Sequence, residues 1–140
     1  MQVLGGGSGG IASARRAAEF GIKVGLIESD RLGGTCVNVG CVPKKVMYYA
    51  ANLREELMHD ARDYGVEVQQ EVGMDWGKLV EKRDAYVERL NGIYQRNLDL
   101  SGVEVIRGWG KFVGEKKVTW VLRLKIISDC IYCPSVHPLL

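Results

Sequence analysis

The stretch VLGGGSGGIASARRAAEFGIKVGLIE, residues 3–28, decides the fold. Apolar segments at residues 2–4 and 23–28 predict short buried strands. The alanine-rich residues 11–20 between them predict a helix that Gly21 closes as a C-cap. A strand, a glycine turn, a helix and a second strand within so few residues are typical of a right-handed βαβ unit. The sequence therefore predicts an α/β fold built on a partial doubly wound, Rossmann-like domain.

The glycine turn matches the pattern G-x-G-x-x-G at Gly5, Gly7 and Gly10. The first glycine permits a tight turn, the second lets the backbone approach a pyrophosphate, and the third lets the helix pack on the strand. A pyrophosphate would bind the free N–H groups at the start of the helix. Glu28 ends the second strand, where an acid can accept the hydroxyls of an adenosine ribose. The pattern favours an NAD or FAD site over a flexible glycine-rich linker, since a linker needs no helix and strand in register.

Downstream of residue 42 the sequence predicts two further helices. Pro43 suits the first turn of a helix that continues to about His59. Apolar residues between 76 and 98 recur at spacings of three, four and seven, which indicates a long amphipathic helix that Gly102 ends.

The last part of the chain first shows strand patterns and then loses any regular hydrophobic period. Residues 103–108 alternate as a strand, and residues 111–121 predict an added β-hairpin that turns at Gly114–Glu115. Residues 119–140 are apolar and aperiodic. We therefore expect a domain at residues 1–118 and a divergent tail at residues 119–140 that is not part of it.

The segment GGTCVNVGCVPKK, residues 33–45, contains two cysteines four residues apart. On one regular helix the Cα atoms of Cys36 and Cys41 would be roughly 8.6 Å apart, whereas a disulfide needs about 4.4–6.8 Å. A bond therefore requires a bend, or Cys36 just before a helix and Cys41 in its first turn. The helix N-terminus, Lys44 and Lys45 would then lower the pKa of the thiols nearest to them.

Two other readings of the cysteine pair remain open at this level. Zinc binding is disfavoured, because the only other cysteines are Cys130 and Cys133 in the tail and no histidine is nearby. Two inert buried thiols are the simpler alternative. A dithiol next to a dinucleotide turn favours redox chemistry over both, and we expect no metal.

Composition limits the class of protein. The 140 residues are 46% hydrophobic and 26% charged, which is typical of one ordinary globular domain. A net charge of +2 gives no reason to expect nucleic acid or an anionic membrane as partner. No apolar run approaches the roughly 20 residues of a membrane span. Because the chain shows neither a signal peptide nor a transit peptide, we expect a cytoplasmic protein.

The glycine turn, Glu28 and GGTCVNVGCVPKK together resemble the FAD-dependent pyridine nucleotide–disulfide oxidoreductases. Within that family, the pair Lys44-Lys45 and the segments MHDARDYG and EKRDAYVERLNGIYQRNL followed by VEVIRG are similar to the glutathione reductase branch. Trypanothione reductases and the larger thioredoxin reductases share the lysine pair. Lipoamide dehydrogenases and mercuric reductases usually have Ser-Lys instead. The resemblance runs from about Val3 to Val118.

The resemblance implies a cofactor, a substrate and residue roles. FAD would be the dinucleotide, and Cys36 and Cys41 would form a redox disulfide over the flavin. Cys36 would attack glutathione disulfide, and Cys41 would receive the electrons that NADPH supplies through FAD. The family also includes mitochondrial forms. The implied catalytic residues are Cys36, Cys41 and Lys44. The implied FAD contacts are Gly5, Gly7, Ser8, Gly9, Gly10, Glu28, Thr35, Cys36 and Lys44. The implied glutathione site comprises Ser8, Arg15, Ile93 and Tyr94, in which the Arg15 guanidinium can pair with a substrate carboxylate.

The family's chains are longer than this one. They carry a second glycine motif for NADPH and a C-terminal domain that forms a homodimer and supplies a catalytic histidine. The 140 residues contain neither feature, and His59 and His137 lie in other contexts. We therefore expect a fold that is incomplete relative to the family and a chain that does not complete the cycle alone. The alternatives are a non-catalytic FAD-binding fragment and a sister reductase of the thioredoxin, trypanothione or mercuric type.

Overall fold

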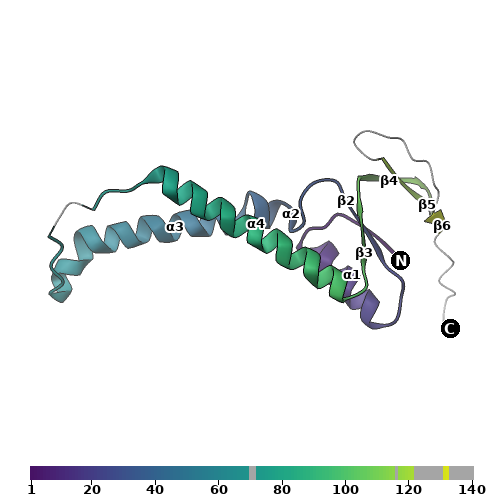
Figure 1. Cartoon of the computed structure of the whole chain (residues 1–140), viewed down its shortest axis with the longest axis horizontal. Helices are drawn as coiled ribbons and strands as arrows, with labels where there is room; N and C mark the ends of the chain where they lie inside the picture. The colour runs from purple at the N-terminus through teal and green to yellow at the C-terminus, as the bar shows by residue number, and fades with distance from the viewer. Residues whose placement is uncertain (70–71, 116, 122–130, 133–140) are drawn as a thin grey trace. The chain divides into compact units, whose positions relative to one another are not determined.

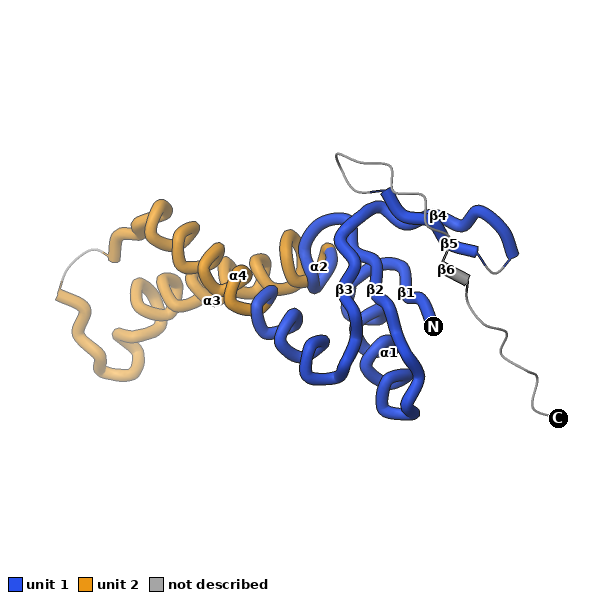
Figure 2. Tube along the Cα trace, turned by 45° about the vertical axis from the view of Figure 1, so that its right-hand side comes forward, with its two compact units in different colours: residues 1–34, 91–140 blue, residues 35–90 orange. Residues whose placement is uncertain are grey.

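The computed structural model describes residues 1–69, 72–115, 117–121 and 131–132 (Figure 1). It divides into two compact units: unit 1 comprises residues 1–34 and 91–140, and unit 2 comprises residues 35–90 (Figure 2). The helices and strands are β1 (Gln2–Leu4), α1 (Ser8–Glu19), β2 (Gly25–Glu28), α2 (Gly34–Asn38), α3 (Cys41–Glu55), η1 (Glu56–Asp60), η2 (Ala61–Tyr64), α4 (Trp76–Leu100), β3 (Glu104–Arg107), β4 (Trp109–Gly114), β5 (Lys117–Val121) and β6 (Ile131–Tyr132). Within the described residues, no helix has both the length and the apolar character needed to span a membrane.

Unit 1 is built on a parallel sheet of order β1-β2-β3. Val3 pairs with Leu26 across β1 and β2, and Leu26 pairs with Val105 across β2 and β3. The helix α1 connects β1 to β2, so the predicted βαβ unit is confirmed. The second strand begins at Gly25 rather than at Lys23, because the chain first closes α1 with the bond from the Gly21 N–H to the Ala18 carbonyl.

The two faces of this sheet are covered differently. On one face, α1 and the end of α4 pack onto the strands in a single apolar cluster. Its buried members are Val3, Ile11, Ala14, Val24, Leu26, Leu32, Leu98 and Val103. On the other face lies β4: a Cβ placed on Gly110 would stand 2.6 Å from Leu4 Cδ2 and 3.2 Å from Ile27 Cγ2. The sheet is therefore sandwiched between helices and the hairpin.

The predicted end of the long helix is confirmed. Gly102 has φ +69°, and the Val103 N–H donates to the Leu98 carbonyl at 3.0 Å, a glycine-based C-cap. The chain then enters β3 in parallel with β2.

The predicted hairpin is also confirmed. β4 and β5 are antiparallel, with Phe112 opposite Val118, and β5 also pairs with β6. The domain boundary after Val118 lies inside β5 and stays a prediction. Most of the predicted tail, including Cys130, Cys133 and His137, lies outside the described residues.

Unit 2 contains α3 and the first part of α4, which lie side by side in Figures 1 and 2. The Arg83 guanidinium reaches Met47 Sδ at 4.0 Å between them. Pro43 is in the first turn of α3, as predicted, and the helix continues as the π-helical η1 and the 3₁₀ turn η2. Asp75 caps α4 by accepting the Lys78 N–H at 2.9 Å.

Candidate functional site

The glycine turn follows β1 directly. Gly5 has φ +93°, and its N–H donates to the Ile27 carbonyl at 2.8 Å, which ties the turn to β2. A Cβ on Gly10 would stand 1.9 Å from the Gly5 carbonyl oxygen, so only glycine lets α1 begin this close to the strand. A Cβ on Gly9 would meet no atom within 4 Å. The structure thus supports the packing role predicted for the third glycine, and it leaves open space beside Gly9.

No acidic or capping side chain offsets the positive end of α1. Gly7 is the N-cap and provides no side-chain hydrogen bond, and the first turn carries no acidic residue. The first N–H groups of a helix have no partner within the helix and form its positive end. This geometry suits the diphosphate of a dinucleotide.

Glu28 is brought to the glycine turn, 22 residues away in sequence. Glu28 is buried, with only 8% of the residue exposed. Its Oε2 accepts the Gly6 N–H at 2.5 Å, and its Oε1 accepts the Asp30 N–H at 2.8 Å. An ionised carboxylate has about four acceptor sites. The two amides therefore fix Glu28 in place and leave acceptor capacity for ribose hydroxyls.

A second glycine pair supports the turn, and sequence reasoning missed it. The Gly33 N–H donates to the Gly6 carbonyl at 2.7 Å, and Gly7 pairs with Gly33 in an isolated parallel bridge. A Cβ on Gly34 would stand 3.0 Å from the Gly7 Cα. The signal was the doubled glycine before Thr35, which we interpreted only as the start of the cysteine segment.

The cysteines lie on two separate helices of the chain. Cys36 is in the five-residue α2, whereas Cys41 is the first residue of α3. Gly40 turns the chain between them. A Cβ on Gly40 would stand 3.3 Å from the Cys36 Cα and 3.0 Å from the Thr35 carbonyl oxygen. The bend predicted from the spacing is present, with the refinement that Cys36 has a short helix of its own.

Both cysteines are free thiols, Cys36 half-buried and Cys41 exposed. The hydrogen bond that the Cys36 S–H donates to the Cys41 sulfur raises the pKa of Cys36, and desolvation adds to this effect. The Cys41 backbone N–H and the Lys44 charge act in the opposite direction but are outweighed. The expected net lowering of the pKa is therefore wrong for Cys36, because the second sulfur stabilises the protonated form of the first.

Lys44 lies beside Cys41 on the exposed face of α3. Cys41, Lys44, Lys45 and Tyr48 line a cavity of about 490 Å³. Their spacing of three, four and seven places them on one helix face. Neither lysine forms an ion pair among the described residues, and the Lys45 ammonium lies 5.5 Å from the centre of the Tyr49 ring.

The residues predicted to bind glutathione lie on α1 and α4 within unit 1. Arg15 is exposed, and its Nε donates to Ser101 Oγ at 3.1 Å; Ser101 in turn donates to the Asn97 carbonyl at 2.8 Å. Tyr94 packs against the apolar cluster. Ile93 is half-buried and Ser8 is exposed. Their role in substrate binding stays a prediction.

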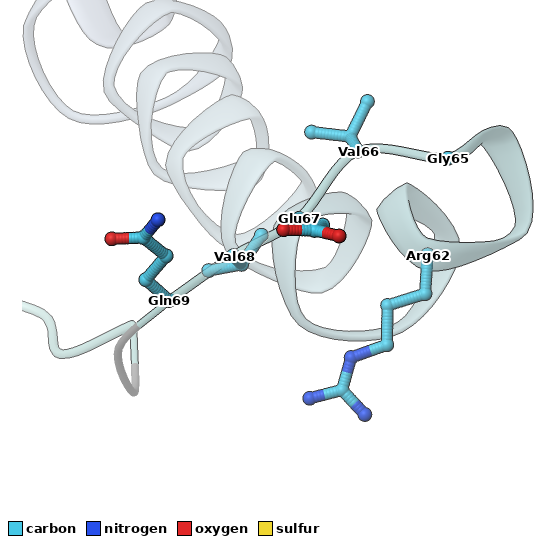
Figure 3. A pocket seen from close by; sticks show the side chains of 6 residues that line it. All are labelled: Arg62, Gly65, Val66, Glu67, Val68 and Gln69. Atoms are coloured by element: carbon cyan, nitrogen blue, oxygen red, sulfur yellow. The ribbon is translucent and has the colours of Figure 1, made fainter.

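A further cavity of about 440 Å³ lies in unit 2, after η2. It is lined by Arg62, Gly65, Val66, Glu67, Val68 and Gln69. Figure 3 shows the extended residues 65–69 running past Arg62. Across the part of the chain that the structure describes, no three His, Cys, Asp or Glu side chains are grouped as metal ligands.

A βαβ unit with an open glycine turn, together with two free cysteines on either side of the turn at Gly40, defines a dinucleotide-dependent, disulfide-handling class of protein. The chain belongs to the pyridine nucleotide-disulphide oxidoreductase family, whose model matches residues 1–128. Membership implies oxidoreductase chemistry with a flavin cofactor.

Three curated relatives carry the name glutathione reductase. The protein of Debaryomyces hansenii is 54% identical over 126 residues, which is 84% of this chain and 26% of the relative. That of Yarrowia lipolytica is 57% identical over 110 residues, covering 76% and 23%. That of Schizosaccharomyces pombe is 56% identical over 117 residues, covering 83% and 25%. The chain thus spans about a quarter of the length of these relatives.

Proposed function

We propose that the chain is the flavin-binding and disulfide-bearing part of a glutathione-disulfide reductase that uses FAD and takes electrons from NADPH. One observation carries this proposal: Gly40 folds the chain so that the free thiols of Cys36, in α2, and Cys41, at the start of α3, lie on either side of one turn. They lie in a chain 54–57% identical to proteins named glutathione reductase. The activity, substrate and partners of the whole protein are part of the proposal.

The residues of unit 1 fit the adenosine diphosphate portion of FAD. The open space at Gly9 and the uncapped start of α1 suit the diphosphate, and the buried Glu28 suits the ribose. Ser8 and the glycines at positions 5, 7 and 10 complete this set. In unit 2 we assign Thr35, Cys36 and Lys44 to the flavin portion. When bound, the flavin would supply an electron pair to the disulfide.

The two thiols can complete the substrate reaction by exchange. The Cys36 thiolate attacks one sulfur of glutathione disulfide, forms a mixed disulfide, and releases one glutathione thiolate, which takes up a proton. The Cys41 thiolate then attacks the Cys36 sulfur, forms the Cys36–Cys41 disulfide, and releases the second glutathione. Two thiols are oxidised and one disulfide is reduced, so the electrons balance.

The raised pKa of Cys36 sets a condition on the first step. The thiolate is the nucleophile, and Cys36 holds its proton to higher pH than an ordinary cysteine because of Cys41. Removal of this proton needs a base. Once formed, the Cys36 thiolate is stabilised by the Cys41 backbone N–H and by Lys44.

For the substrate, we assign Ser8, Arg15, Ile93 and Tyr94. The bond from Arg15 Nε to Ser101 leaves both terminal nitrogens of the guanidinium for a carboxylate. We further propose a homodimer in the whole protein and a reducing compartment such as the cytoplasm, which maintains free thiols.

The second candidate is a flavin-binding chain without turnover of its own. It is favoured by the glycine pattern: the 140 residues contain 18 glycines but only one G-x-G-x-x-G motif, so they provide one turn for a dinucleotide, whereas turnover needs both FAD and NADPH. The purified chain, supplied with FAD, NADPH and glutathione disulfide, should then show no NADPH oxidation. Sustained turnover would overturn this expectation.

The proposed roles of the thiols are tested by trapping. The reduced chain is exposed to glutathione disulfide without oxygen, and its peptides are analysed by mass spectrometry. Cys41→Ser should accumulate a mixed disulfide on Cys36, whereas the wild-type chain should form the intramolecular disulfide. Because Cys41 is the more exposed thiol, the competing result is a mixed disulfide on Cys41 in Cys36→Ser with none on Cys36 in Cys41→Ser. That result would reverse the roles.

A further inference from the structure

The helix α4 reaches the loop between β2 and α2 through the side chain of Asn91. The Asn91 Nδ2 donates to the Leu32 carbonyl at 2.7 Å, although the two residues are 59 positions apart in the sequence. A carbonyl oxygen accepts hydrogen bonds and cannot donate them, so only the amide nitrogen of Asn91 can make this contact. The bond therefore holds one particular peptide group of the loop.

That peptide group is the one that supports the glycine turn. The Leu32 carbonyl and the Gly33 N–H belong to the same planar unit, and the Gly33 N–H donates to the Gly6 carbonyl at 2.7 Å. The Leu32 residue is only 1% exposed, and a Cβ placed on Gly6 would stand 2.7 Å from Leu32 Cδ2. Asn91 thus acts on the centre of the turn through a single peptide group and one buried side chain.

A second amide of α4 holds the same loop nearer its start. Gln95 follows Asn91 by one helical turn, so the two side chains lie on the same face of α4. The Gln95 Oε1 accepts the Arg107 Nη2 at 3.1 Å, and the Arg107 Nη1 donates to the Asp30 carbonyl at 2.9 Å. The loop is therefore tied to α4 at two of its carbonyls, with Asn91 acting as a donor and Gln95 as an acceptor.

We propose that Asn91 is a positioning residue for the bound dinucleotide, a role that no assignment above gives it. The inference rests on the proposed function, because it takes FAD as the ligand of the glycine turn. A turn that is already held in its bound conformation loses less entropy when the ligand binds. When Asn91 is replaced, the peptide group before the turn loses its tie to α4, and part of the binding free energy must then order the turn.

The test changes both amides of α4 to the acids of the same shape. In Asn91→Asp, an ionised carboxylate has no proton to donate to the Leu32 carbonyl. FAD affinity, measured by equilibrium dialysis, should fall about tenfold, because a hydrogen bond is lost and two acceptors then face each other. Gln95→Glu is the matched comparison. It keeps the acceptor for Arg107 and loses only the exposed bond to Asp99, so FAD affinity should stay within about twofold of wild type.

A second measurement separates positioning of the turn from a general loss of stability. Amide hydrogen exchange, followed by NMR, reports the opening of individual hydrogen bonds. In Asn91→Ala, the Gly33 N–H should exchange about tenfold faster than in the wild-type chain, because its peptide group has lost one of its two bonds. The Val103 N–H, which donates to the Leu98 carbonyl at the end of α4, should keep its rate. Equal acceleration at both amides would overturn the positioning role.

The outcomes keep the inference and the proposed function apart. If Asn91→Asp binds FAD as tightly as the wild-type chain, and Asn91→Ala leaves the exchange rate at Gly33 unchanged, the positioning role is wrong while the flavin site stands. Equal losses of FAD affinity in Asn91→Asp and Gln95→Glu would also overturn it, since the added negative charge alone would explain them. If the wild-type chain binds no FAD, the assignment of the glycine turn to FAD fails, and the inference fails with it.

Discussion

The N–H of Gly6 donates a 2.5 Å hydrogen bond to Oε2 of Glu28. One buried carboxylate thus joins the glycine turn to the end of β2. The same side chain accepts the Asp30 N–H, so it organises the loop on each side of the strand end. Glu28 is therefore both a structural group and the proposed acceptor for the ribose.

Replacing Glu28 should lower both stability and FAD affinity. In Glu28→Ala, two buried N–H groups lose their acceptor, which should cost about 1–3 kcal/mol of the free energy of unfolding. Urea denaturation followed by far-UV circular dichroism measures this loss. Glu19→Ala is the matched control. Glu19 is 59% exposed and pairs with Arg16 on the surface, and such pairs contribute about 0–1 kcal/mol. Equal losses in the two variants would contradict the role given to Glu28.

Gly9 and Gly10 are adjacent, but they should respond differently to alanine. Gly10→Ala places a Cβ 1.9 Å from the Gly5 oxygen, so α1 must shift, at a cost of about 1–3 kcal/mol. Gly9→Ala meets no atom within 4 Å and should preserve or slightly raise the melting temperature, because alanine favours helix. The methyl group would nevertheless occupy the space assigned to the diphosphate. FAD binding should therefore fall in Gly9→Ala while its fold persists, as thermal melts with and without FAD would show.

Gly40→Ala should separate the two thiols. The new Cβ would stand 3.3 Å from the Cys36 Cα and 3.0 Å from the Thr35 oxygen, so α2 must move away from Cys41. Formation of the disulfide in a glutathione redox buffer, followed by thiol titration, should shift toward the open dithiol. Gly73→Ala, where a Cβ meets no atom within 4 Å, should leave this equilibrium unchanged. A disulfide that is equally stable in both variants would contradict the role of Gly40 in holding Cys36 close to Cys41.

The reactivity of Cys36 should depend on pH in a direction set by its neighbours. Only the thiolate reacts with iodoacetamide, and Cys41 raises the pKa of Cys36. Cys41→Ala removes the hydrogen bond that raises this pKa, so the midpoint of alkylation at Cys36 should move to lower pH. Lys44→Met removes a charge that lowers the pKa, so the midpoint should move to higher pH. Peptide-level mass spectrometry over a pH series gives both midpoints, and shifts in the same direction would contradict the proposed electrostatics.

Local pattern was sufficient for the main elements of this fold, although it missed the short helix α2. Apolar runs around a glycine turn predicted β1, α1 and β2. Spacings of three, four and seven predicted α4, whose core-facing Leu98 is fully buried. These features depend on backbone geometry and hydrophobic period within one element. The cysteine spacing also required a bend, since a regular helix holds such a pair too far apart.

The contacts that complete the candidate site were decided by the tertiary structure. The bond between Gly6 and Glu28 and the bridge between Gly7 and Gly33 join segments that are far apart in the sequence. No periodicity records such pairings. The pKa of Cys36 was mispredicted for a related reason. Charge and helix position are visible in the sequence, whereas the influence of Cys41 on Cys36 arises only once Gly40 has folded α2 against the start of α3.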